Sequence, residues 1–201
     1  LNLIGTVKAS ATPSTAAIGD LITVSAEGLA PTSGSDTVTV MFDDAKVATL
    51  VDRKAGNAIK SESVSTDSGG DVAFTFNVPS AGAGSHQIRL VQDADAGGNG
   101  NTAIDFGIAF TVTGSVVVLP SSGVVGDSLT VTGTGFGANS TVFVDFGSAS
   151  NAATVAANSA GSFTAKFDAP AQPNGSVTVT ARSSTATAAG AFAVNESIAF
   201  L

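Results

Sequence analysis

The chain has 201 residues and a formal net charge of −8 at pH 7, because 16 Asp and Glu outnumber 8 Lys and Arg. It contains no cysteine, which excludes disulfides and thiol chemistry. The basic residues form no cluster that would bind phosphate, so nucleic acid is not an expected partner. No apolar run approaches the roughly 20 residues of a transmembrane helix, so membrane insertion is not expected either.

The N-terminal segment LNLIGTV alternates like a strand. Leu1, Leu3 and Val7 would share one face of an extended backbone, with Ile4 on the other face. A secretory signal needs a basic region ahead of a longer apolar core, whereas here the first lysine follows the apolar residues. We therefore interpret residues 1–5 as part of a mature, secreted chain, with an apolar face that another segment covers.

Further along the chain, apolar and polar residues alternate in segments separated by Gly, Asn and Pro. This pattern is typical of half-buried antiparallel strands joined by turns. In order, the segments form two matching sets: IGDLITVSAEGL (18–29), DSGGDVAFTFNVP (67–79) and GSHQIRL (84–90), then VGDSLTVTGTGF (125–136), NSAGSFTAKFDAP (158–170) and GSVTVTAR (175–182). The matching order predicts two copies of one sandwich in tandem.

The first copy is the longer one. The offset between matching residues falls from 107, between residues 18 and 125, to 82, between residues 110 and 192. The extra residues fall near 31–36, within 43–66 and at 93–101, and we predict that they are loop insertions. The predicted organisation is a donor-strand-like segment (1–5), a first Ig-like domain (6–113), a second Ig-like domain (114–194) and a C-terminal strand segment (195–201).

The segment GTGFGANSTVFVDF (133–146) resembles the Ig-like repeats of bacterial and archaeal surface proteins. The resemblance covers both halves of the chain, more cleanly the second. It implies an all-β fold of two tandem Ig-like antiparallel β-sandwiches, with extra strand segments at both termini, in an extracellular or cell-surface location. The sequence has no Cys pair, core Trp or tyrosine corner, so the antibody-type variant is excluded.

The two ends of the chain suggest a function. ESIAFL (196–201) aligns with GSVVVL (114–119), so we interpret it as the opening strand of a following repeat. The face of Leu1, Leu3 and Val7 resembles the donor strands of bacterial pilins and archaeal filaments, in which one subunit completes the sheet of the next. We therefore expect a structural subunit that polymerises with itself, head to tail, into an extracellular filament. The residues expected at the polymer junction are Leu1, Leu3, Ile4, Val7, Ile198, Phe200 and Leu201.

Three alternatives stay open. LNLIG would extend the first strand of its own domain, or the chain would be a stalk or S-layer segment of a larger cell-surface protein. A third alternative is a carbohydrate-binding or adhesin module, with glycans or the surfaces of other cells as partners. Sugar platforms usually present Trp or Tyr, and the sequence has neither.

The insertion DADAGGNGN (93–101) is the best candidate for binding an ion. It places carboxylate and amide oxygens at alternating positions among glycines, as calcium loops do, although the spacing is not that of an EF-hand. The candidate ligands are Asp93, Asp95, Asn99 and Asn101, with Asp105 from the following strand. The alternative is a hairpin loop in which Asp, Asn and Gly serve only turn geometry. Calcium is the one cofactor that the sequence suggests.

No enzyme is expected. His86 is the only histidine, and its place beside Ile88 and Leu90 on one strand face predicts a partly buried strand residue. The glycine-rich stretch at 133–140 precedes a predicted strand, whereas a phosphate-binding loop opens a helix.

Three Asn-x-Ser/Thr sequons begin at Asn139, Asn174 and Asn195. Asn139 and Asn174 are predicted in exposed turns, where a glycan would have room.

Overall fold

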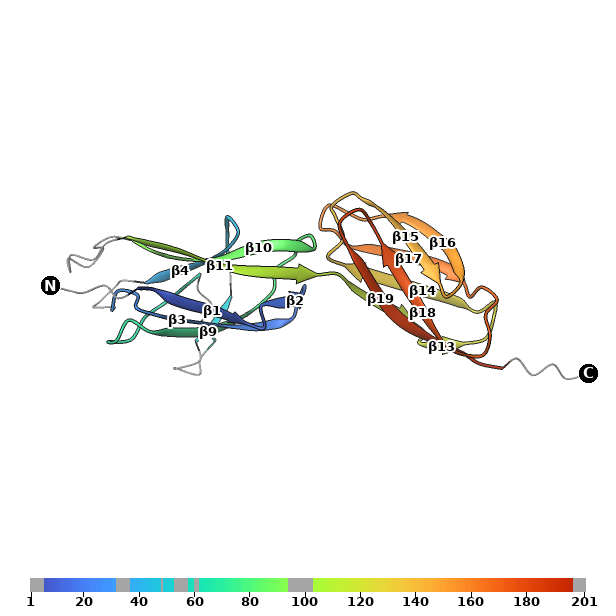
Figure 1. The fold of residues 1–201 in the computed structure, drawn as a ribbon, viewed down its shortest axis with the longest axis horizontal. Coiled ribbons are helices and arrows are strands. Elements are labelled where there is room, and N and C mark those ends of the chain that lie inside the picture. The colour runs from blue at the N-terminus through green and yellow to red at the C-terminus, as the bar shows by residue number, and fades with distance from the viewer. Residues whose placement is uncertain are drawn as a thin grey trace, which may run out of the picture. The chain divides into compact units, whose positions relative to one another are not determined.

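The computed structural model describes residues 6–31, 37–47, 49–52, 58–59, 62–93 and 103–196. Strands and turns make up this part of the chain, and none of its segments is a helix able to span a membrane. The chain divides into two compact units (Figure 1). The first comprises described residues of Leu1–Pro79 and Ser85–Thr111, and the second those of Ser80–Gly84 and Val112–Leu201.

The first unit is a sandwich of two mainly antiparallel sheets. Its strands are β1 (Lys8–Thr12), β2 (Thr15–Ala17), β3 (Leu21–Glu27), β4 (Val38–Phe42), β5 (Ala45–Lys46), β6 (Leu50–Asp52), β7 (Ala58–Ile59), β8 (Ser63–Val64), β9 (Val72–Asn77), β10 (Gly84–Gln92) and β11 (Ile104–Thr113). One sheet has the order β1-β3-β9-β6-β7; the other has the order β2-β11-β10-β4-β5, with β8 also paired to β4.

The second unit repeats this plan with fewer strands (Figure 1). Its strands are β12 (Ser115–Leu119), β13 (Ser122–Gly123), β14 (Ser128–Thr134), β15 (Thr141–Phe146), β16 (Ala149–Ala156), β17 (Phe163–Asp168), β18 (Gly175–Arg182) and β19 (Thr187–Val194). The sheets have the orders β12-β14-β17 and β13-β19-β18-β15-β16. The predicted fold class, two tandem Ig-like antiparallel sandwiches, is confirmed.

Alternation builds both cores, although Phe74, Thr75 and Phe76 of β9 are buried in succession. In β17, Phe163 and Ala165 are buried while Thr164 and Lys166 are exposed, as the sequence pattern predicts. Phenylalanine fills both interiors, and burying each such side chain contributes about 1.5–3 kcal/mol. The fully buried phenylalanines are Phe74, Phe76 and Phe110 in the first unit and Phe136, Phe146 and Phe192 in the second.

The duplication extends to individual turn contacts. The Oδ1 atoms of Asp67 and Asn158, at matching positions, each accept two backbone N–H bonds within the next four residues. Just after them, Gly70 (φ +82°) and Gly161 (φ +71°) lie against the carbonyl oxygens of Leu29 and Phe136. A Cβ on either glycine would come within 2.0 or 1.9 Å of that oxygen, so both repeats need glycine there.

The range 43–66, within which an insertion is predicted, contains the short strands β5 to β8 among its described residues. The place of the insertion stays a prediction. β5 pairs with β4, whereas β6 pairs with β9 in the opposite sheet. In the second unit, the one strand β16 follows β15 and pairs with it along its length. The added residues of the first repeat let the chain pass from one sheet to the other and extend it.

Candidate functional site

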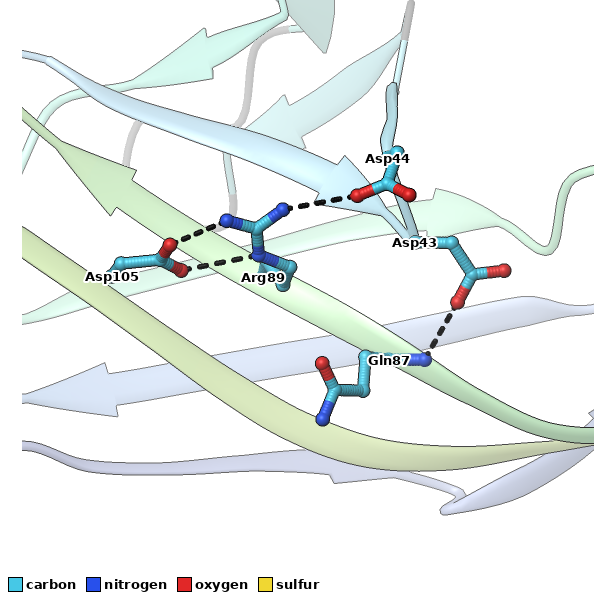
Figure 2. Close-up of polar contacts among 5 residues, drawn as sticks. All are labelled: Asp43, Asp44, Gln87, Arg89 and Asp105. Carbon is cyan, nitrogen blue, oxygen red and sulfur yellow. Dashed lines mark hydrogen bonds and ion pairs between the residues drawn. The ribbon is translucent and has the colours of Figure 1, made fainter.

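A polar cluster lies on β10, β11 and the β4–β5 turn of the first unit. Figure 2 shows five of its members, Asp43, Asp44, Gln87, Arg89 and Asp105. An open depression of about 670 Å³ lies beside them; its lining residues are Asp43, Asp44, Ser85, His86, Gln87 and Arg89.

Asp43 connects the β4–β5 turn to β10. It has a left-handed backbone (φ +53°), and its N–H donates to the carbonyl oxygen of Gln87 at 2.7 Å. Its Oδ1 accepts the Gln87 N–H at 2.9 Å, and its Oδ2 lies 2.7 Å from Nδ1 of His86. Burial raises the pKa of Asp43, but the hydrogen bonds from His86 and Gln87 and the His86 charge together lower it by more. The pKa of this carboxyl therefore lies below its ordinary value of 3.8.

Arg89 joins two further carboxylates across the strands. Its Nε donates to Oδ1 of Asp105 at 3.1 Å, a second nitrogen donates to Oδ2 of Asp105, and Nη1 lies 3.3 Å from Oδ1 of Asp44. The hydrogen bond from Arg89 lowers the pKa of Asp105, and the same bond raises the pKa of Arg89. Because Asp44 and Asp105 are exposed, solvent screens these pairs and they contribute little to stability.

Asp43 and Phe42 orient the imidazole of His86. Its ring stacks on Phe42 with centroids 5.2 Å apart, and its side chain is 15% exposed. The adjacent Ser85 precedes it in the strand, and neighbouring strand side chains point to opposite faces. The hydroxyl is therefore not presented to the imidazole as a Ser–His–Asp relay requires. This position agrees with the prediction that His86 is a partly buried strand residue.

The cluster is specific to the first repeat. Gly147 (φ +56°) and Val177 stand in the second unit at the places of Asp43 and His86. The second unit carries a different polar cluster, in which Arg182 donates to Oδ2 of Asp145 at 2.9 Å and to Oδ1 of Asn151 at 2.8 Å. The bonds from Arg182 and from the Asn151 N–H lower the pKa of Asp145.

The predicted junction residues fall mostly outside the described part of the chain. Leu1, Leu3, Ile4, Ile198, Phe200 and Leu201 lie outside it, and Val7 is half-buried just ahead of β1. The predicted interface therefore stays a prediction.

Of the predicted calcium ligands, Asp95, Asn99 and Asn101 also lie outside the described residues. Asp93 is exposed at the end of β10. Asp105 is held by Arg89, so it would have to leave an ion pair to bind a cation. Among the described residues, no group of three His, Cys, Asp or Glu is placed to hold a metal ion.

All three sequon asparagines are exposed. Asn139 lies in the turn before β15 with φ +56°, while Asn174 and Asn195 flank the paired ends of β18 and β19, where Gly175 faces Val194. Occupancy by glycans stays a prediction.

Sequence reasoning missed the Asp43–His86 contact and the Arg89 network. The partners of Arg89 are 16 and 45 residues away in the chain, so no local spacing links them. The one available signal was Asp43, which stands at the position where the second repeat has Gly147.

Comparison with solved structures finds low-identity likenesses. The adhesin InvE of Yersinia pseudotuberculosis is 16% identical with a TM-score of 0.37, and the match covers 94% of this chain and 59% of that one. The D0–D1 domain of intimin is 18% identical with a TM-score of 0.30, covering 93% of this chain and 98% of that one. Invasin, a bacterial integrin-binding protein, is 16% identical with a TM-score of 0.34, and the match covers 94% of this chain and 39% of that one.

No curated protein matches the sequence. A family model does match the second unit, over a range that contains every strand from β12 to β19. The model is that of the IPT/TIG domain, and it matches residues 114–194.

Proposed function

We propose that the chain is a non-enzymatic, structural pair of Ig-like modules from an extracellular, cell-surface protein. The observation that carries the proposal is the tandem duplication. Two sandwiches share turn contacts such as Leu29 with Gly70 and Phe136 with Gly161, while their polar surface clusters differ. A shared frame with different surfaces suits a spacer or presenting module better than a catalytic domain.

Charge and composition support an exposed setting. The chain is acidic, and the polar cluster of the first unit is an open network of ion pairs. Such a surface stays solvated, and the depression beside it is not an apolar pocket that would enclose a small substrate.

The proposal is tested by labelling intact source cells with antibodies against the purified chain. Surface labelling of unpermeabilised cells, lost after external protease treatment, is the expected result. Labelling that appears only after permeabilisation would overturn the proposal.

A filament subunit is the second candidate, favoured by the alternating apolar residues of LNLIGTV. Leu1, Leu3 and Ile4 of one copy would complete a sheet of the next, and Ile198, Phe200 and Leu201 would cover the junction. Burying the four side chains Leu1, Leu3, Ile4 and Val7 contributes on the order of 6–12 kcal/mol, at about 1.5–3 kcal/mol each. Ordering the segment costs about 1–2 kcal/mol per residue, so it needs a preformed groove.

Electron microscopy of the native protein and of a variant lacking residues 1–5 tests this candidate. Filaments from the full chain and folded monomers from the truncated chain are expected. Filaments from the truncated chain would exclude strand donation by this segment. Monomers from both chains would exclude the filament subunit and favour the surface module.

A further inference from the structure

Asn174 and Gly175 lie at the start of β18, and both are exposed to solvent. Among the described residues, Asn174 is the only asparagine that a glycine follows. Because glycine has no Cβ, its backbone nitrogen stays open to the side-chain amide of the residue before it. A Cβ added at Gly175 would meet no atom within 4 Å, so the backbone is uncrowded there.

The Gly175 nitrogen lies at the end of a sheet. Gly175 pairs with Val194, and this is the last pair between β18 and β19. Terminal pairs open most readily, because neighbouring pairs hold them on one side only. When this pair opens, the Gly175 nitrogen can approach the side chain of Asn174, which has no hydrogen-bond partner among the described residues.

Two other asparagines of the second unit are restrained. Oδ1 of Asn158 accepts two backbone N–H bonds, at 2.9 and 3.0 Å, so its side-chain amide is held in place. After Asn139, the N–H of Ser140 donates to the carbonyl oxygen of Gly137 at 3.1 Å, so the following nitrogen is held instead. In both cases the next residue also has a Cβ. Asn174 therefore differs from them in its side chain and in its neighbour.

We propose that Asn174 is a site of deamidation in which the backbone of Gly175 is the nucleophile. The Gly175 nitrogen gives its proton to hydroxide and attacks Cγ of Asn174. The N–Cγ bond forms, the Cγ–Nδ2 bond breaks, and ammonia leaves with a proton taken from water. Water then opens the cyclic imide at either carbonyl. The products are aspartate and isoaspartate, and no oxidant or reductant takes part.

Deamidation and glycosylation exclude each other at this position. Asn174, Gly175 and Ser176 form a sequon, whose glycan would be attached to Nδ2. That nitrogen is the leaving group of the deamidation, and the aspartate product has no amide to which a glycan could be attached. An Asn174 that leaves the cell without a glycan is therefore the substrate. This chemistry does not depend on the proposed surface role.

The modification should loosen the end of the sheet. It adds a negative charge at residue 174, beside the end of β19, where Glu196 already carries one. Like charges repel, and isoaspartate also inserts an extra methylene into the backbone ahead of Gly175. The pair between Gly175 and Val194 should consequently open more often after conversion than before it.

Peptide mass spectrometry of the full chain tests the proposal, with protein from a host that adds no N-glycans, aged in mildly alkaline buffer. The tryptic peptide 167–182 contains Asn174 as its only asparagine, which separates it from the pair Asn99–Gly100 outside the described residues. In the folded chain, Asn174 should convert within about tenfold of its rate in guanidinium, because only a terminal pair has to open. Asn158, isolated by a second digest, should convert only in guanidinium.

Two variants separate the chemistry from the sequon. Ser176→Ala removes the sequon and keeps Asn174 beside Gly175, so it should convert like wild type. Asn174→Gln keeps an amide, but its longer side chain forms the cyclic imide far more slowly, so the peptide should stay unmodified. In protein from the native source, peptides that carry a glycan on Asn174 should show no conversion.

Two results would overturn the proposal. One is an Asn174 that stays intact in the folded chain while it converts in guanidinium, because the fold would then protect it. The other is equal conversion of Asn158 and Asn174 in the folded chain, because the restraints described above would then have no effect. Cell-surface labelling is read independently of either result.

Discussion

Gln92 holds the backbone of Ala30 with both ends of its side-chain amide. Its Oε1 accepts the Ala30 N–H at 3.0 Å and its Nε2 donates to the Ala30 carbonyl at 3.0 Å, although the two residues are 62 positions apart. Thr66 donates a further bond to the same carbonyl at 2.8 Å. The clamp is buried, since Gln92 is 2% exposed, and it ties the segment after β3 to the end of β10.

Gln92→Glu should destabilise the fold by about 2–4 kcal/mol at pH 7, because a buried carboxylate would face the Ala30 carbonyl. Burial raises the pKa of such a glutamate, and the protonated form can donate to that carbonyl. The loss should therefore shrink as pH falls. Urea unfolding at pH 5 and pH 7 measures this. Gln92→Met is the matched control, which should cost about 1–3 kcal/mol with no added pH dependence.

Gly161→Ala should be strongly destabilising, because the new Cβ would lie 1.9 Å from the Phe136 carbonyl oxygen. Left-handed strain adds about 1–2 kcal/mol to this clash, so we expect a loss above about 3 kcal/mol. Gly126→Ala is the control, since Gly126 has φ +90° and a Cβ added there would meet no atom within 4 Å. Gly126→Ala should be destabilised only by the left-handed strain, about 1–2 kcal/mol. Equal losses in thermal unfolding of the two variants would contradict the role of the carbonyl contact.

Asp43 should stabilise the fold near neutral pH and lose this effect in acid. A carboxyl whose folded-state pKa lies below its unfolded value stabilises the fold above that value, here 3.8, and the contribution is lost as pH falls through the folded pKa. Wild type should therefore exceed Asp43→Asn in stability near pH 6, by less than about 1 kcal/mol because the side chain is half exposed. The difference should vanish near pH 2. Asparagine keeps the left-handed turn and an acceptor for Gln87, so a difference that persists in acid would contradict the charge effect.

Calcium should raise the melting temperature of the chain if residues 93–101 bind it. Asp93→Asn should weaken that response, because Asp93 begins the oxygen-rich segment. Asp105→Asn should leave it unchanged, because Arg89 already holds Asp105. Differential scanning calorimetry in calcium and in chelator measures all three chains. If calcium does not shift the melting temperature of the wild-type chain, the calcium site is excluded. If Asp105→Asn loses the response, Asp105 is one of the calcium ligands.

Asn139, Asn174 and Asn195 should carry glycans in protein purified from its native source, because all three are exposed on the second unit. Peptide mass spectrometry of the native chain, with Asn→Gln variants expressed in the same source, locates them. Unmodified asparagines in all three peptides would contradict the prediction.

Alternation alone determined much of the fold. The pattern of Phe163, Ala165 and Lys166 decides which side of a strand is buried, since the side-chain period is two whatever the partner strand. The paired turn signals at residues 67–70 and 158–161 likewise predicted the tandem duplication. These are local properties, which a sequence carries within ten residues.

Tertiary structure decided the contacts between distant segments. Local patterns could not predict that β6 crosses to β9, that Asp43 meets His86, or that Gln92 closes on Ala30, because each pairing depends on which strands become neighbours after long loops close. It also decided which apolar side chains stay in solvent. Val117 and Leu119 have the alternation of any half-buried strand, yet they are 50% and 61% exposed in the folded second unit.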